Sequence, residues 1–288
     1  MTITNERARV ERGMPDTKYF GQTDFLNRST AFSVYAGGGI VQEFLADGGK
    51  LFAGNAGTDL GTKADMVFQS IAGGSTVEKA MSSLFSTPPA EVLSKSGSRA
   101  GKAYTDWKLE QGDKPELTDS DREKLMRMFR NFARNQRAVE LLEATEDTQL
   151  SVFWEDLNGY KRKARADGVT NALWYDLKTT SAASMSLVPK SVMAYGYHWQ
   201  AAWYYAAAMA ADWPSGWAMP FIFMQSVPPY TCAVYRLPEG LIVEASQQID
   251  ETLRNMRMRE ELGEYLPEDY GVELEMIVPE WLLKKASA

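Results

Sequence analysis

The stretch that decides the fold spans residues 150–180 and reads LSVFWEDLNGYKRKARADGVTNALWYDLKTT. Two strand-like segments, Leu150–Trp154 and Tyr160–Val169, flank Asn158-Gly159, a dipeptide that favours the tight turn of a β-hairpin. A further turn leads into a third strand-like segment, Leu173–Thr179. The sequence therefore predicts three consecutive strands, each joined to the next by a short connection.

Helices and further strands are predicted on both sides of this stretch. An amphipathic helix is predicted over Ser120–Glu143, because apolar residues recur along it at helical spacing. After the strands, the pattern predicts a helix, two strands and a long helix over Ala194–Ala211, Ala218–Val227, Tyr230–Leu237 and Gly240–Leu262. This order is typical of an α/β fold in which helices flank a mixed central β-sheet.

The chain is expected to form one domain. Residues 1–20 are polar and predicted to be a flexible segment, and residues 21–288 are predicted to form a single domain. Residues 36–62 are rich in glycine, and a helix is predicted to resume near Thr62–Ile71. Residues 86–118 combine prolines, glycines and serines, which is typical of a loop with short helical pieces.

The composition excludes several classes of site. The chain has 288 residues, 44% hydrophobic and 24% charged, so it can bury a large core. A single cysteine, Cys232, excludes an intramolecular disulfide and a cysteine-cluster zinc site. A single histidine, His198, disfavours a Ser-His-Asp triad, in which it would have to be the base. Subtracting 38 acidic from 31 basic residues gives a net charge of −7, which disfavours general coating of nucleic acid but permits a locally basic groove.

No segment predicts secretion or membrane insertion. The N-terminal residues MTITNERARVERGM carry charges where a secretion signal needs an apolar run. The most apolar stretch, Ala201–Ala211, is far shorter than the roughly 20 residues that a membrane span needs. We therefore expect a cytoplasmic protein that does not contact a membrane.

Three charged residues on neighbouring predicted strands form the candidate catalytic group. Asp167 ends one strand, whereas Asp176 and Lys178 lie two positions apart on the next, so these two side chains share a face about 7 Å apart along the strand. Pairing of the strands would bring the two carboxylates together. With a main-chain carbonyl, two carboxylates suit Mg²⁺. The alternative is an Asp–Lys ion pair on a half-exposed sheet, because Asp16 and Lys18 show the same spacing outside any strand pattern.

Basic residues near this group could contact nucleic acid. Strand alternation places Lys161, Lys163 and Arg165 on the face of the first carboxylate. The helix predicted before the strands carries an arginine ridge that includes Arg130 and Arg134. Such residues neutralise backbone phosphates and give salt-dependent, sequence-independent binding. The alternative for the ridge is a solvated helix face.

These motifs resemble those of the RecE-type exonucleases, a branch of the PD-(D/E)XK nuclease superfamily. The resemblance rests on SVFWED at 151–156, KARAD ending at 167, DLKTT at 176–180 and YGYHWQAAWY at 195–204. Looser similarity, including Gly61-Thr62 and VPEW at 278–281, extends it over roughly residues 20–285. The implied fold is the restriction-endonuclease-like core of that superfamily.

The resemblance implies roles for individual residues. Asp167 and Asp176 would be metal ligands together with the main-chain carbonyl of Leu177, and Lys178 would be the catalytic lysine.

A helix of the resemblance adds two more residues to the site. Gln200 and Tyr204 match the family's Q-x-x-x-Y pattern, and a spacing of four puts both on one helix face. His198 should point elsewhere, and we interpret it as a structural histidine.

The chain departs from the family at two positions. Asp65 stands where relatives carry a metal-binding histidine, and Gln149 where they carry a glutamate. A carboxylate is a tolerable substitute for imidazole at Mg²⁺, and the carbonyl of Gln149 could still coordinate the ion. The same departures also fit a catalytically weak or inactive protein that binds DNA ends.

By this resemblance we expect a Mg²⁺-dependent exodeoxyribonuclease, with Mn²⁺ as a substitute ion, that degrades linear double-stranded DNA in the 5′→3′ direction. The resemblance further implies a role in phage or prophage recombination inside a bacterial host cell. It also implies a ring-like homo-oligomer and a single-strand annealing recombinase as partner. A nuclease of different polarity, or one specific for single strands, is the alternative enzyme.

Overall fold

A computed structural model describes residues 8–51, 56–213 and 219–266 of the chain, and it contains a six-stranded sheet. The strands are β1 (Arg9–Glu11), β2 (Asp147–Glu155), β3 (Lys161–Val169), β4 (Trp174–Thr180), β5 (Pro220–Gln225) and β6 (Cys232–Arg236). They lie side by side in chain order, and all neighbours are antiparallel except β4 and β5, which are parallel. The sheet is therefore mixed, as predicted.

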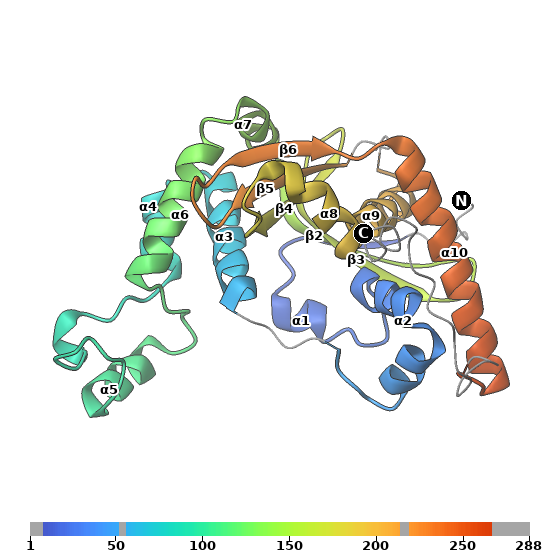
Figure 1. Cartoon of the computed structure of the whole chain (residues 1–288), viewed down its shortest axis with the longest axis horizontal. Helices are drawn as coiled ribbons and strands as arrows, with labels where there is room; N and C mark the ends of the chain where they lie inside the picture. The colour runs from blue at the N-terminus through green and yellow to red at the C-terminus, as the bar shows by residue number, and fades with distance from the viewer. Residues whose placement is uncertain (1–7, 52–55, 214–218, 267–288) are drawn as a thin grey trace, which may run out of the picture.

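Helices cover both faces of the sheet (Figure 1). Their bounds are α1 (Asp16–Phe20), α2 (Arg28–Ala46), α3 (Ala56–Ala72), α4 (Val77–Leu84), α5 (Lys102–Gln111), α6 (Asp119–Phe132), α7 (Gln136–Glu143), α8 (Val188–Ala194), α9 (Tyr197–Ala210) and α10 (Glu239–Leu262), with short 3₁₀ turns η1 (Ala90–Val92) and η2 (Met185–Leu187). One core packs α2, α9 and α10 against the sheet, and a second packs α3, α4, α6 and α7 against it. The α/β fold with a mixed central sheet flanked by helices is thus confirmed.

The predicted hairpin joins β2 to β3. Gly159 adopts a φ of +74°, which glycine tolerates without strain. The Asp156 carboxylate accepts hydrogen bonds from the main-chain N–H groups of Asn158 (2.9 Å) and Tyr160 (3.0 Å) and so closes the turn. The parallel pair β4 and β5 needs a long crossover, and α8 and α9 supply it. This crossover lays α9 across the strands that carry the candidate catalytic group.

Two predicted helices differ in their bounds from those observed. The helix predicted over Ser120–Glu143 is α6 followed by α7, because the Asn135 side chain accepts from the N–H of Ala138 (3.0 Å) and starts a new helix. The helix predicted from Ala194 begins instead at Tyr197, after Gly196 turns the chain with a φ of +63°. Both predictions were wrong in their bounds, because the Asn135 cap and the left-handed turn at Gly196 each interrupt a continuous apolar pattern.

Two segments are more ordered than predicted. Of residues 1–20, the described part contains β1, which pairs with β2, and α1. The glycine-rich region holds most of α2, which kinks at Gly38, where φ is +68°. A side chain at Gly39 would meet the main-chain oxygen of Tyr265, because its Cβ would lie only 1.6 Å away. These glycines permit close packing and do not mark a loop.

Residues 86–118 form an arm that agrees with the predicted loop containing short helical pieces, η1 and α5. Figure 1 shows α5 apart from the sheet, beyond α4 and α6. Within the described ranges, no helix combines the length and apolarity needed to cross a membrane. The VPEW motif at 278–281 lies outside the described residues.

Candidate active site

The site forms where β3 and β4 part. These strands pair only at Gly168–Tyr175 and Val169–Trp174. In the opening beyond, the Asp167 carboxylate accepts the main-chain N–H of Leu177 at 2.8 Å. The N–H and C=O of one strand residue point to the same strand edge, so the Leu177 carbonyl is also directed to this opening. A cavity of about 410 Å³ lies there, lined by residues from α1, α2, α3, α9 and the strands β2, β3 and β4.

On the other side of β3, the strand β2 also leaves regular pairing opposite Asp167. Gln149 has a φ of +52°, a left-handed conformation that costs a non-glycine residue roughly 1–2 kcal/mol. Its amide donates to Asp167 (3.2 Å) and to both carboxylate oxygens of Asp65 (3.3 and 3.2 Å). Gln69, one helical turn after Asp65 on α3, donates to the same carboxylate at 2.9 Å. Strained residues cluster at functional sites, and this one bridges two half-buried acids.

Repulsion and burial raise the pKa values of these acids. Burial, reinforced by the charge of Asp176, raises the pKa of Asp65 to about 6. Burial and the charges of Asp176 and Asp65 raise the pKa of Asp167 well above its usual range. A cation beside Asp65 and Asp167 would favour their charged forms.

The third carboxylate is held by β4 and α9. Gln200 donates to Asp176 at 2.8 Å, and Lys178 forms an ion pair with its other oxygen. The Tyr204 hydroxyl donates to the Arg165 carbonyl of β3 and lies 3.4 Å from Asp176. Although burial opposes its charge, Lys178 has a raised pKa because Asp176 and Asp167 stabilise the ammonium. Lys178 therefore enters the cavity as a cation.

The residues fit a divalent cation in the kind of ligand they offer. No group of three or more His, Cys, Asp or Glu side chains within the described ranges has the geometry to hold a metal ion. The Gln149 amide lies between two of the acids instead. Mg²⁺ commonly binds through one or two carboxylates, substrate phosphate and water, so it does not need three protein acids. Asp167, Asp176 and the Leu177 carbonyl could supply such a partial set.

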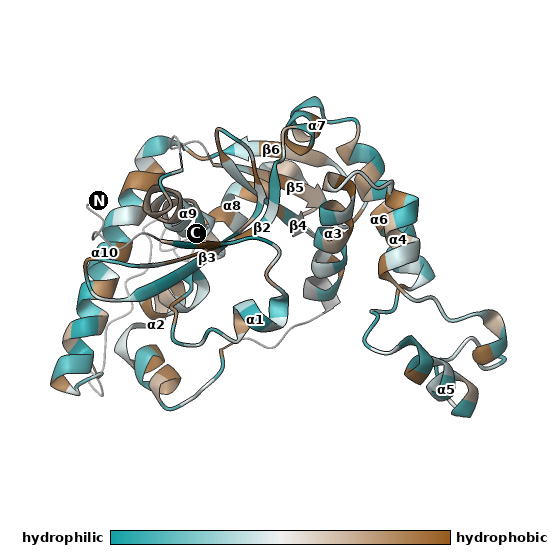
Figure 2. Ribbon diagram, turned by 180° about the vertical axis from the view of Figure 1, so that it is seen from behind, coloured by the Kyte–Doolittle hydropathy of each residue, from teal (hydrophilic) through white to brown (hydrophobic). Residues whose placement is uncertain are grey.

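The predicted basic residues of β3 have different environments. β3 is hydrophilic along much of its length (Figure 2), and both Lys163 and Arg165 line the cavity, whereas Lys161 is exposed. The Lys163 ammonium is buried and donates to the main-chain carbonyls of Tyr19 (3.0 Å) and Gln22 (2.7 Å). These contacts give Lys163 a structural role in anchoring α1, and its contact with DNA stays a prediction.

The arginine ridge is not part of the cavity. Arg130 is exposed on α6, and Arg134 is exposed in the link to α7. Because the predicted single helix is divided, these arginines do not form one continuous stripe. Their contact with DNA stays a prediction about the outer surface. His198 is buried outside the cavity, near Phe32.

Arg28 at the start of α2 was not predicted to belong to the site. Its guanidinium donates to the Tyr195 carbonyl (2.9 Å) and to the side-chain oxygen of Gln200 (3.4 Å), and it lines the cavity. Burial lowers its pKa, while Tyr204 and Asp176 oppose that shift. Asn27-Arg28-Ser29-Thr30 reads as a helix cap, but nothing in the sequence shows that this helix begins beside β4.

Comparison with known proteins supports the fold and leaves the family open. No protein-family model matches the chain, and no curated protein sequence does. A crystal structure of a protein named "putative exonuclease" from Eubacterium rectale superposes with a TM-score of 0.59, covering 94% of this chain and 98% of that one. The two sequences are 13% identical. The chain is therefore similar in fold to a protein named as an exonuclease.

Proposed function

We propose that this chain is a metal-dependent deoxyribonuclease of the RecE-type branch of the PD-(D/E)XK superfamily, degrading linear double-stranded DNA from its ends. The observation that carries the proposal is the meeting of Asp167, Asp176 and Lys178 in one cavity, where β3 and β4 part. The shared fold with a protein named as an exonuclease and the sequence motifs support it independently. The 5′→3′ direction is proposed from the sequence resemblance alone.

The proposed roles follow from the contacts. Asp167, Asp176 and the Leu177 carbonyl would hold Mg²⁺ or Mn²⁺, with Asp65 beside them. When bound, such an ion would polarise a phosphoryl oxygen and lower the pKa of a water. The Lys178 ammonium, kept charged by Asp176 and Asp167, is a hydrogen-bond donor and would stabilise charge that develops on the phosphate.

The α9 residues keep this arrangement in place. Gln200 donates to Asp176 and accepts from Arg28, so its amide orientation is set from both ends. Burial and the charge of Asp176 raise the pKa of Tyr204 well above its usual value, so its hydroxyl stays protonated and holds the carbonyl of Arg165. We propose that both act as positioning residues for the carboxylates and β3.

The resemblance also leads us to propose the biological setting. The chain would act in phage or prophage recombination in the cytoplasm of a bacterial host, as a ring-like homo-oligomer on DNA ends. A single-strand annealing recombinase would be its partner.

The test uses linear duplex DNA labelled separately at each 5′ and 3′ end, with Mg²⁺ or with EDTA. We expect mononucleotides to be released from the labelled 5′ ends only with Mg²⁺. Asp176→Asn should lower the rate about a thousandfold, equivalent to ~4 kcal/mol of transition-state stabilisation. Asp212→Asn makes the same chemical change at an exposed position and should leave the rate unchanged.

A second candidate function is a DNA-end-binding protein without nuclease activity. The Gln149 amide between Asp65 and Asp167 favours this alternative. It donates hydrogen bonds to two carboxylates that would face a cation in an active enzyme. Folded wild-type protein that binds DNA ends but leaves them intact with both Mg²⁺ and Mn²⁺ would decide for this alternative.

A further inference from the structure

Two cations of β3 hold α1 at the cavity. Lys163 donates to main-chain carbonyls on and after α1, and the guanidinium of Arg165 lies 4.3 Å from the ring centre of Tyr19 and 5.2 Å from that of Phe20. Tyr19 and Phe20 line the cavity themselves. Figure 1 shows α1 between α2 and α3, which also contribute to the lining. The helix thus forms part of the cavity wall through contacts with these two basic residues.

The two cations differ in whether they have a side-chain donor without a hydrogen-bond partner. Two hydrogen bonds and the face of Tyr19, at 4.9 Å, occupy the ammonium of Lys163. One terminal nitrogen of Arg165 forms an ion pair with Asp16 at 2.8 Å. Its other terminal nitrogen is buried and has no hydrogen-bond partner among the described residues. A guanidinium presents donors in a fixed fork that matches a phosphate, so Arg165 could bind a phosphate through this nitrogen and the one that Asp16 occupies.

The two partners of the ion pair also differ in their exposure to solvent. The Arg165 side chain is 10% exposed, whereas that of Asp16 is 71% exposed. A carboxylate so exposed is well hydrated when released, so the ion pair is weak. Arg165 lines the same cavity as Asp65, Asp167 and Asp176, so its positive charge lies in the same cavity as the carboxylate group. A phosphate here would replace a weakly held carboxylate on a largely buried cation.

We propose that Arg165 binds a backbone phosphate next to the carboxylate group, and that Asp16 occupies Arg165 until DNA displaces it. Asp16 is thus a competing anion within the chain, which α1 holds at the cavity. This proposal rests on the proposed function, because it names the phosphate contact that a nuclease of this kind would use.

The first test is the affinity for duplex DNA, measured by fluorescence anisotropy with Ca²⁺ in place of Mg²⁺. Asp16→Asn should lower the dissociation constant two- to five-fold, the factor that corresponds to an exposed ion pair. Asp24→Asn removes one negative charge from an exposed position in the same N-terminal region and is the matched control. Equal affinities of these two variants would overturn the inference.

The second test asks whether Asp16 acts through Arg165. Arg165→Gln should weaken DNA binding and reduce the slope of log affinity against log salt by about 1. Asp16→Asn should then have no effect in the Arg165→Gln background. Arg165→Lys, which keeps the charge, should retain part of the effect, and thermal melts establish that each variant is folded. An undiminished effect of Asp16→Asn without Arg165 would overturn the inference.

The two proposals fail differently. Wild-type protein that does not bind DNA under any of these conditions would overturn the proposed function and this inference with it. Wild-type protein that degrades DNA while Asp16→Asn matches Asp24→Asn would overturn the inference alone.

Discussion

At the scale of single residues, the site depends on acids that are costly to ionise together. Asp167 lies where β2 and β4 both leave β3, so its carboxylate can take the Leu177 N–H and the Gln149 amide at once. Those two donors offset part of the repulsion from Asp65 and Asp176. Gln149, whose amide lies between Asp65 and Asp167, has a left-handed backbone conformation at this point.

A pH prediction concerns His198. Burial, as the largest cause, lowers its pKa below the value of about 6.5 expected in the unfolded chain. The folded state therefore favours the neutral ring, and stability is lost as pH falls below the unfolded pKa. We expect wild type to lose stability relative to His198→Gln between pH 7 and pH 5, by about 1.4 kcal/mol per unit of lowered pKa.

Urea denaturation of both proteins at pH 7, 6 and 5 measures this difference. Asp65, with a pKa raised to about 6, binds its proton more readily when folded and contributes in the opposite direction. That contribution is present in both proteins and cancels in the comparison. A difference that stays constant over the three pH values would contradict the prediction.

How far the sequence predicted the site can be seen residue by residue. The alternation of side chains along a strand predicted that Asp176 and Lys178 share a face. The turn after β3 predicted that Asp167 lies near them. Both predictions were possible because the three residues are close in the sequence. Arg28 was missed because its place depends on how α2 docks against α9. The contacts of Lys163 with the carbonyls of Tyr19 and Gln22 were missed because nothing in the sequence shows that these residues lie over β3.

At the scale of elements, the same difference between local and long-range information holds. The hairpin β2–β3 was predicted because its turn is encoded in two adjacent residues. The helix α2 was not predicted, because its glycines are typical of a loop and the packing of Gly39 against Tyr265 involves a residue remote in the chain. The helix pair α6–α7 was predicted as one helix because its apolar face continues across the cap at Asn135.

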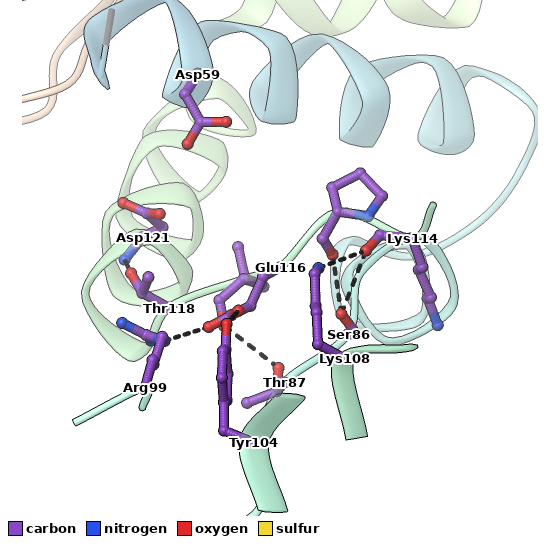
Figure 3. A network of polar contacts seen from close by, with 12 residues as sticks. Asp59, Ser86, Thr87, Arg99, Tyr104, Lys108, Lys114, Glu116, Thr118 and Asp121 are labelled. Carbon is purple, nitrogen blue, oxygen red and sulfur yellow. Dashed lines mark hydrogen bonds and ion pairs between the residues drawn. The ribbon is translucent and has the colours of Figure 1, made fainter. Parts of the chain in front are cut away.

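The arm formed by residues 86–118 yields a prediction at this scale. Glu116 accepts a hydrogen bond from Tyr104 (2.6 Å) and pairs with Arg99, and Figure 3 shows both partners converging on it. α5 has no buried residue, so it contributes little to the core. Glu116→Gln should therefore raise amide hydrogen exchange in residues 98–111 several-fold while changing Tm by less than about 2 °C.

The control for the arm is Glu110→Gln, which makes the same change at an exposed position on α5. Exchange measured by mass spectrometry should show no local increase in this variant. If Glu116→Gln lowered Tm strongly, or left exchange in the arm unchanged, Glu116 would not be the residue that holds the arm.

At the scale of the whole molecule, the site lies where the two cores meet the sheet. Asp65 belongs to α3, which packs in one core, whereas Gln200 and Tyr204 belong to α9, which packs in the other. A ligand that bridges these elements would link both halves of the fold. Its binding should therefore appear as a change in the stability of the entire domain.

This gives the last prediction, on metal-linked stability. A divalent ion at ten times its dissociation constant stabilises the folded state by about 1.4 kcal/mol, which raises Tm by roughly 3–6 °C for a domain of this size. Mg²⁺ or Mn²⁺ should produce that rise over EDTA, and NaCl of equal ionic strength should not. Asp167→Asn should abolish the rise and should be more stable than wild type in EDTA, because one of the repelling charges is gone while an oxygen still accepts the Leu177 N–H. Asp212→Asn should behave as wild type in both solutions. An equal rise in Asp167→Asn would show that the ions act elsewhere on this acidic chain, and the carboxylate group would lose its proposed role as the metal site.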